Sequence, residues 1–335
     1  MDLSLLTAFW LRTRPLDVTR NGEALGVGQA GEPIRERIAD CPRYPMDQVM
    51  SIHKTVQLFY NPQAGSYSDA TIDRLQQAFR DTGARVHLTP SVDTPPVIDP
   101  AATHICIAGG DGTVRHVAEA VVRANRELPV AIYPAGTVNL LAREGKLGRR
   151  PARLAQALVH GTTRRHSPVK AGDNLFFACA SVGPDSLAVA SVASSVLKQQ
   201  LGRFAYVAAV ARLLHKWPRH RITLRADGRS WDCEAVYIAK GRYYAGPWSF
   251  APQAKGDDGQ LHVVALRRAG RREFLRFYWR LLGGADVARD KNVIAFSCTQ
   301  LSLQSDDPLP VQADGDVVAS CPIDVSIHET PVHIC

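Results

Sequence analysis

Residues 105–113 read Ile-Cys-Ile-Ala-Gly-Gly-Asp-Gly-Thr and give the clearest indication of the fold. The first four residues are a short apolar run typical of a buried strand, and residues 114–124 have helical spacing. A glycine-rich turn between a strand and a helix lets the backbone approach a ligand and directs free N–H groups at an anion. Phosphate is the natural anion for such a turn. Asp111 would be repelled by phosphate, so it suits a Mg²⁺ shell, an ordered water or a substrate hydroxyl.

This turn alone does not decide the function. A tight turn with Asp111 as a helix cap explains the same residues. The chain also lacks the G-x-x-x-x-G-K-[ST] pattern of Walker-type phosphate loops.

The residues around the turn alternate between strand and helix patterns. Apolar runs predict strands at 56–60, 86–88, 105–108 and 130–133, and helical spacing predicts helices at 69–82, 114–124 and 152–159. Such alternation favours a parallel sheet with loops at its carboxyl ends. We therefore predict an α/β nucleotide-binding domain over residues 50–162.

After residue 162 the pattern becomes mostly β. Strands are expected at 175–180, 221–224, 235–239, 261–266 and 301–304, and Asp227-Gly228 predicts a hairpin turn. Two helical segments interrupt them, at 186–217 and 271–282. Residues 163–335 are therefore expected to form a second, β-rich domain whose C-terminal end is a candidate to return to the first.

Composition narrows the class of protein. The 335 residues carry a formal net charge of +8, which favours acidic partners, but the basic residues are dispersed without a nucleic-acid-binding motif. Seven scattered cysteines without a C-x-x-C pair favour reduced thiols. No apolar run approaches the roughly 18 residues of a membrane span. We expect a cytoplasmic protein that binds membranes transiently and no nucleic acid.

The first 49 residues show little periodicity. We expect a flexible leader, or a translated upstream stretch preceding a natural start at Met46 or Met50. Residues 26–31 fit G-x-G-x-x-G, but Asn21-Gly22 before them and Glu32-Pro33 after them are not the strand and helix of a dinucleotide site. We interpret that match as chance.

Six motifs in order make the chain recognisable. They are Asn61-Pro62-x-x-Gly65, Gly109-Gly110-Asp111-Gly112-Thr113, Pro134-Ala135-Gly136-Thr137-Val138-Asn139, Ala251-Pro252-x-Ala254, Asp257-Asp258-Gly259-Gln260-Leu261 and Val311-Gln312-Ala313-Asp314-Gly315. With them, residues 56–325 resemble the diacylglycerol kinase catalytic family, especially its soluble bacterial lipid kinases. Sphingosine kinases are more distant, and NAD kinases share the glycine motif. The resemblance implies an α/β domain and a β-sandwich-like domain, with ATP and lipid meeting in the cleft between them.

The resemblance also assigns site residues. It implies ATP with Mg²⁺, an Asp257, Asp258 and Gln260 loop that holds a structural metal ion, and Asp314 as the general base. Asp111, matching the base argued for sphingosine kinases, is the alternative base. The ATP site would be lined by Asn61, Gly65, Gly109, Gly110, Asp111, Gly112, Thr113, Gly136, Thr137 and Asn139.

The assignment of Asp314 has a competing interpretation, and the residue after its motif differs from the family pattern. Asp314-Gly315 is also an ordinary hairpin-turn signal. The family usually continues Asp-Gly-Glu, whereas Asp316 follows here, which keeps the charge but shortens the reach. A role for that third residue is thereby in doubt.

The substrate would lie in a membrane. Arg272, Arg276 and Arg280 are spaced by four on one predicted helix face among aromatic residues, which suits an anionic membrane surface. A packed amphipathic helix with a solvated arginine face explains the same pattern. The sequence does not determine the oligomeric state, and a homodimer is one candidate.

The resemblance predicts transfer of the γ-phosphoryl group of ATP to a lipid such as diacylglycerol. Alternatives are a kinase of a sphingoid base or another lipid alcohol, an NAD kinase-like enzyme, and a non-catalytic regulator. The chain lacks the Asn-Glu dipeptide of NAD kinases. Retention of Asp111, Asp258 and Asp314 argues against a non-catalytic regulator.

Overall fold

The computed structural model describes residues 54–92, 95–193, 217 and 219–335. The leader, the hexapeptide at 26–31 and most of the expected helix at 186–217 lie outside these residues. Of that helix, the structure describes α6 (Pro184–Ala193). None of the described helices has both the length and the apolar character needed to cross a bilayer.

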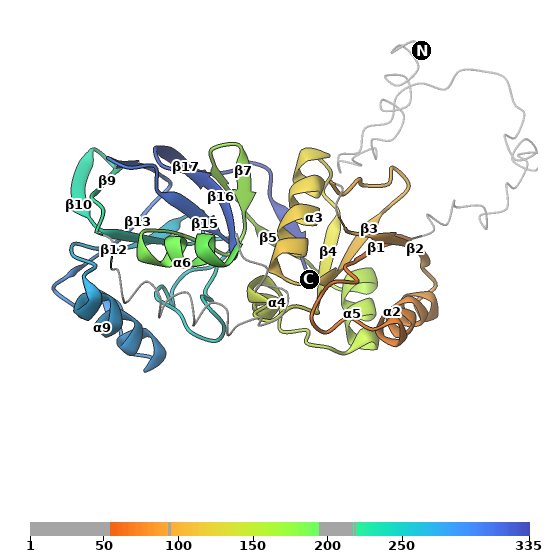
Figure 1. The fold of residues 1–335 in the computed structure, drawn as a ribbon. Helices are drawn as coiled ribbons and strands as arrows, with labels where there is room; N and C mark the ends of the chain where they lie inside the picture. Colours follow the sequence, from red (N-terminus) through yellow and green to blue (C-terminus); the bar gives the residue numbers. More distant parts are fainter. Residues whose placement is uncertain (1–53, 93–94, 194–216, 218) are drawn as a thin grey trace, which may run out of the picture. The chain divides into compact units, whose positions relative to one another are not determined.

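The first layer is a mostly parallel sheet in the order β2-β1-β3-β4-β18-β5 (Figure 1). Helix α3 (Asp111–Arg123) packs on one face, and α2 (Asp69–Asp81) and α5 (Pro151–His160) pack on the other. The short helix α4 (Leu140–Gly145) follows β4. The strands are β1 (Thr55–Tyr60), β2 (Arg85–Pro90), β3 (His104–Gly109), β4 (Pro129–Pro134), β5 (Arg164–His166) and β18 (Val332–Ile334).

The chain's last strand closes this sheet. β18 pairs parallel with β4 and antiparallel with β5, although residues 167–331 lie between it and β5 in the sequence. Val332 and Ile334 are buried in the core beneath α3. The C-terminal end therefore lies in the nucleotide-binding layer, where it joins the two halves of the molecule.

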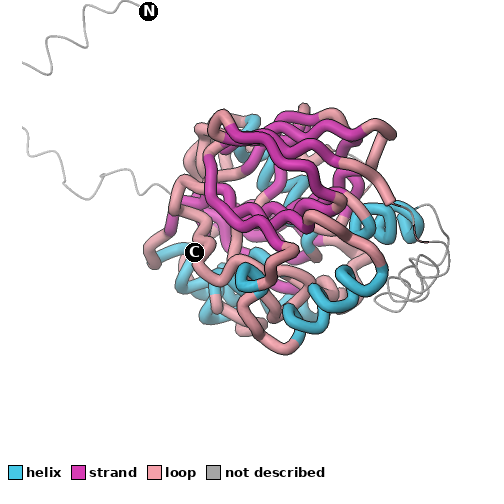
Figure 2. The backbone as a smooth tube through the Cα atoms, turned by 90° about the vertical axis from the view of Figure 1, so that its left-hand side faces the viewer, coloured by secondary structure: helices cyan, strands magenta, loops and turns pink. Residues whose placement is uncertain are grey.

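The second part is two antiparallel sheets with a shared core, the sandwich visible in Figure 2. One sheet has the order β10-β9-β14-β17-β6-β7, with strands Arg229–Cys233, Ile222–Ala226, Gln300–Ser305, Ile323–Ile327, Val169–Ala171 and Asn174–Phe176. The other has the order β13-β12-β11-β8-β15-β16, with strands Val293–Cys298, Leu261–Leu266, Ala235–Ala239, Cys179–Val182, Pro310–Ala313 and Asp316–Ser320.

One predicted strand is wrong. Residues 175–180 form two strands, β7 and β8, which belong to different sheets of the sandwich. The apolar run is continuous because its side chains are buried on both sides, in three different clusters, so periodicity does not reveal the crossing. Phe177 and Ala178 lie at the crossing, where their backbone N–H groups take no part in the hydrogen bonds between strands.

Helix α9 (Arg271–Leu282) covers the outer face of the second sheet, followed by the 3₁₀ turn Val287–Arg289. Phe274, Phe277 and Leu281 are its buried side chains. Its bounds match the predicted helix. The Asp227-Gly228 hairpin between β9 and β10 is also confirmed, with positive φ at both residues, 50° and 71°.

Candidate active site

Two glycine loops meet backbone to backbone at the carboxyl ends of β3 and β4. A Cβ added to Gly136 would lie 2.4 Å from the Gly110 Cα, and one added to Gly109 would lie 2.5 Å from the Thr113 Cβ. A side chain at 136 would force the two loops apart, whereas one at 109 would collide with Thr113 in the first turn of α3. These contacts explain why both predicted motifs require glycine.

Asp111 joins the two loops. Helix α3 begins at Asp111, three residues earlier than predicted, so this carboxylate lies in its first turn. Its Oδ2 accepts a hydrogen bond from the Asn139 N–H at 2.8 Å, and its Oδ1 accepts one from the Leu140 N–H at 2.6 Å. Burial is the main cause that raises the pKa of Asp111 to about 6. The nearby Asp314 charge also raises this pKa, whereas the hydrogen bond from the Leu140 N–H lowers it.

Asn139 and Asn61 hold the loops in shape. Asn139 adopts a left-handed backbone with φ of 55°, accepts a hydrogen bond from the Gly136 N–H at 2.8 Å and donates one to the Gly136 carbonyl at 2.6 Å. Asn61, after β1, donates to Thr113 Oγ1 at 3.1 Å. These predicted ATP-site residues therefore act on the loops themselves, and through them position the α3 N-terminus.

Asp314 is locked in place by the backbone of the crossing between β7 and β8. Its Oδ2 accepts from the Phe177 N–H at 2.7 Å, and its Oδ1 accepts from the Ala178 and Cys179 N–H groups at 2.9 and 3.0 Å. Three of about four acceptor sites of the carboxylate are thus used. Burial raises the pKa of Asp314, although these three N–H groups oppose the change.

Asp314 both belongs to a hairpin turn and lines the candidate site, so the two interpretations of this residue are compatible. Asp314 and Gly315 form the hairpin turn between β15 and β16, with φ of 49° and 93°. Asp316 follows, and its Oδ2 lies 3.3 Å from the Arg115 guanidinium. The shorter side chain at 316 therefore reaches α3, close to Gly112, where an added Cβ would lie 3.1 Å from the Asp316 Oδ2.

A cavity of about 570 Å³ brings these elements together. A second cavity of about 1050 Å³ shares Asn61, Gly112 and Thr113 with it. The predicted residues that line the first cavity are Asn61, Gly110, Asp111, Gly112, Thr113, Gly136, Thr137 and Asp314. Gly65, Gly109 and Asn139 do not line it, but Gly109 and Asn139 shape its loops.

Comparison with known proteins decides the family. A diacylglycerol kinase catalytic domain profile matches residues 55–171, and a YegS C-terminal NAD kinase beta sandwich-like domain profile matches residues 178–335. A probable lipid kinase YegS-like from Pseudomonas aeruginosa is 30% identical over 280 residues, covering 80% of this chain and 89% of that protein. The chain belongs to the diacylglycerol kinase-like lipid kinase family.

Other relatives agree with this family. A diacylglycerol kinase of Bacillus subtilis is 22% identical over 277 residues, covering 78% of this chain and 90% of its own length. The solved structure of a diacylglycerol kinase from Bacillus anthracis str. Sterne has the same fold, with a TM-score of 0.68 at 18% identity, covering 84% of this chain and 96% of its own.

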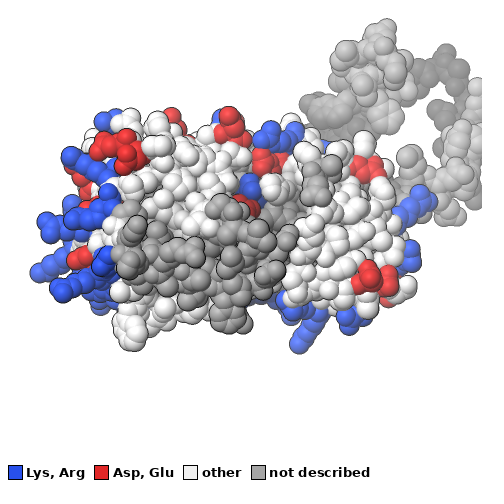
Figure 3. Space-filling model, viewed as in Figure 1, with Lys and Arg blue, Asp and Glu red and all other residues white. Residues whose placement is uncertain are grey.

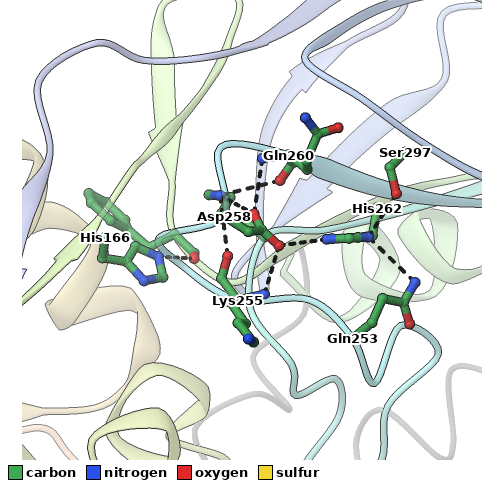
Figure 4. Close-up of polar contacts among 9 residues, drawn as sticks. His166, Gln253, Lys255, Asp258, Gln260, His262 and Ser297 are labelled. Atoms are coloured by element: carbon green, nitrogen blue, oxygen red, sulfur yellow. Dashed lines mark hydrogen bonds and ion pairs between the residues drawn. The ribbon is translucent and has the colours of Figure 1, made fainter.

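The loop at residues 255–260 does not fit the metal site that the family resemblance implied. Asp258 Oδ1 accepts hydrogen bonds from the Lys240 ammonium at 3.0 Å and the Gln260 N–H at 2.9 Å. Its Oδ2 accepts from His262 Nε2 at 2.7 Å and the Lys255 N–H at 3.0 Å, so all of its acceptor sites are used (Figure 4). Burial acts to raise the pKa of Asp258, but these donors outweigh it and lower the value to about 2.

The other two predicted metal ligands lie elsewhere. Asp257 is exposed and lines a separate cavity with Lys146 and Arg242, while Gln260 directs its side-chain amide away from Asp258 in Figure 4. No group of three or more His, Cys, Asp or Glu side chains suited to a metal occurs among the described residues. The side chains of Asp257, Asp258 and Gln260 therefore do not fit a shared metal ion in this arrangement, and a metal ion in this loop stays a prediction.

The sequence motifs missed two buried charged residues, Asp185 of the first cavity and Arg115 of the adjoining cavity. Asp185, at the start of α6, accepts hydrogen bonds from Ser181 at 2.5 Å and from Tyr278 of α9 at 2.9 Å. Arg115 is 6% exposed and lies beside Asp316. A signal existed for Arg115, since a cation near a helix N-terminus is unfavourable without a nearby anion. Asp185 gave no comparable signal.

Proposed function

We propose that this lipid kinase transfers the γ-phosphoryl group of ATP to the hydroxyl of a lipid such as diacylglycerol. The observation that carries the proposal is one cavity that joins the α3 N-terminus, the two glycine loops and the buried Asp314 carboxylate. Phosphoryl transfer to an alcohol needs these three parts: phosphate binding, in-line placement and a proton acceptor.

The ATP phosphates would bind at the N-terminus of α3, where backbone N–H groups and the helix dipole favour anions. The adjoining cavity, which shares Asn61, Gly112 and Thr113, offers room for the nucleoside. Val138, Leu140 and Val189 give the first cavity an apolar wall for the lipid. The reacting groups would then meet beside Gly112.

Asp314 would act as the general base. The lipid hydroxyl gives its proton to the remaining acceptor site of Asp314, its oxygen bonds to the γ-phosphorus, and the bond to the β-phosphate oxygen breaks to release ADP. Asp111 fits a role beside a nucleotide-bound Mg²⁺, because only two described backbone N–H groups outside α3 occupy its oxygens. Such an ion, when bound, supplies neutralisation of phosphate charge.

Helix α9 would face the membrane that holds the lipid. Leu275, Trp279 and Leu282 are 50%, 81% and 49% exposed and follow helical spacing. Arg276 and Arg280, by contrast, contact Asp290 at 3.0 Å and the Asp286 carbonyl at 2.8 Å. Lys and Arg side chains gather over this end of the molecule in Figure 3. The apolar stripe, flanked by this charge, suits an anionic bilayer surface.

A lipid-panel assay tests the reaction. Wild type and Asp314→Asn are given labelled ATP with diacylglycerol, phosphatidylglycerol, a sphingoid base, and NAD as a soluble acceptor. We expect label in a lipid for wild type, and a rate at least about 10²-fold lower for the variant. Labelled NAD would favour the NAD kinase alternative. ATP binding without transfer would favour a regulator, and full activity of Asp314→Asn would move the base to Asp111.

Vesicle sedimentation tests the membrane surface. Trp279→Ser should bind vesicles containing anionic lipid several-fold more weakly, because it removes the most exposed apolar side chain of the stripe. Val317→Ser, on the exposed strand β16, is the matched control and should bind as wild type does. Equal binding by all three proteins would contradict a role for α9.

A further inference from the structure

Lys240 places a positive charge inside the sandwich domain. The residue directly follows β11, and its side chain is 0% exposed. Its ammonium donates hydrogen bonds to Asp258 Oδ1 at 3.0 Å, to the Gln260 carbonyl at 3.2 Å and to the Lys255 carbonyl at 3.4 Å. An ammonium has three donors. Each of them has an oxygen partner in the loop at residues 255–260.

The three acceptors are one carboxylate and two backbone carbonyls, the kinds of oxygen that bind Ca²⁺ or Mg²⁺ in proteins. A metal ion at their centre would need oxygens at about 2.0–2.6 Å, and the Lys240 nitrogen fills that centre. We propose that the Lys240 ammonium is the resident cation of this loop, in place of a divalent metal ion, and that the loop folds without metal.

The backbone of Lys240 also connects the loop to the proposed base. The backbone N–H of Lys240 donates to the Ala178 carbonyl at 2.8 Å, and the backbone N–H of Ala178 donates to Asp314 at 2.9 Å. Gly256 lies against His166, where a Cβ would be 1.9 Å from Nδ1, and His166 donates to the Phe177 carbonyl at 2.6 Å. The loop thereby supports the crossing that presents Asp314, whatever the free metal concentration and whichever acceptor the enzyme uses.

Metal content and thermal unfolding of the full chain test the proposal without an activity assay. Wild-type protein dialysed against EDTA should hold no stoichiometric divalent metal. Its unfolding temperature, without nucleotide, should be the same in EDTA, Mg²⁺ or Ca²⁺. Lys240→Met should unfold on the order of 5–10 °C lower, because Asp258 keeps its charge but loses its buried partner. Lys255→Met is the matched control, since its exposed side chain is not a partner of Asp258, and it should unfold as wild type does.

Replacing Lys240 by a smaller residue tests whether a Ca²⁺ ion can occupy the place of the Lys240 ammonium. Lys240→Ala opens space beside the three oxygens, so Ca²⁺ should raise its unfolding temperature while leaving Lys255→Ala unchanged. A folded Lys240→Ala protein that ignores Ca²⁺ would overturn the equivalence. One divalent ion per wild-type chain, whose removal lowers the unfolding temperature of wild type but not of Asp258→Asn, would overturn the whole proposal. This last comparison decides the question even if the Lys240 variants do not fold.

Discussion

The loops at Asp111 and Asp258 both carry an aspartate next to glycine, and the structure uses these two loops in opposite ways. Asp111 accepts two N–H groups from the neighbouring loop and lines a cavity. Asp258 accepts four donors, one of them the ammonium of a fully buried lysine. The first loop can still take a ligand and the second is internally complete. A ligand-binding motif binds only where its own fold leaves polar groups unsatisfied.

The largest effect is expected for a change in the loop at residues 255–260, where all acceptor sites of Asp258 are used. Asp258→Asn should lower the free energy of unfolding by about 3–5 kcal/mol, because the Lys240 ammonium would remain buried without an opposite charge. Urea unfolding measures this. Asp257→Asn, one residue away and exposed, is the control and should change stability by less than about 0.5 kcal/mol. Equal stability of the two variants would mean that the Lys240–Asp258 contact carries no net energy.

The corresponding change in the loop that carries Asp111 should affect catalytic activity more than folding stability. In Asp111→Asn one carboxylate oxygen becomes an NH₂ group that faces an N–H donor, so the two loops lose their alignment. We expect kcat/KM to fall roughly 10²–10³-fold, as for loss of a transition-state contact. Asp316→Asn, at the half-exposed rim, should cost less than about tenfold. If the rim variant were the more damaging one, Asp316 and not Asp111 would organise the phosphates.

The contact between the two glycine loops should matter next. Gly136→Ala would place a methyl group 2.4 Å from the Gly110 Cα, so the free energy of unfolding should fall by roughly 1–3 kcal/mol and ATP binding should weaken. Chemical unfolding and nucleotide titration measure both. Gly65→Ala is the stability control, since an added Cβ there meets nothing within 4 Å. A stable Gly136→Ala protein would show that the loops can separate freely.

The smallest effect is a pH dependence. Because Asp111 has its pKa raised to about 6, its ionised form, which accepts both N–H groups, is lost as the pH falls through that value. Log(kcat/KM) should therefore decrease by about one per pH unit below pH 6. The sign for stability is opposite: a raised carboxyl pKa makes this group destabilising as the pH rises from about 4 to 6. An activity profile that is flat down to pH 5 would contradict the raised pKa.

Particular residues show how far sequence reasoning reached. Residues 105–113 predicted β3, the turn and a following helix, because apolar runs and glycine turns are local signals. The helix start was placed three residues late, since glycine is a poor helix former, and the positions of Gly110 and Gly112 depend on contacts with the distant Gly136 and Asp316. The missed crossing at Phe177 and Ala178 had no periodic signature, although it supplies the donors that hold Asp314.

The family, the α/β layer followed by the β-rich sandwich, and the two carboxylates of the candidate site could all be predicted from the residues alone. These follow from local patterning and from motifs whose order along the chain is distinctive. The contact of Lys240 with the loop of Asp258, 18 residues later, became visible only in the folded chain, which also confirmed that the C-terminal end returns to the first sheet. Whether a carboxylate binds a metal depends on which donors fold around it, and the donor that brings a positive charge to Asp258 comes from the end of strand β11, 18 residues away.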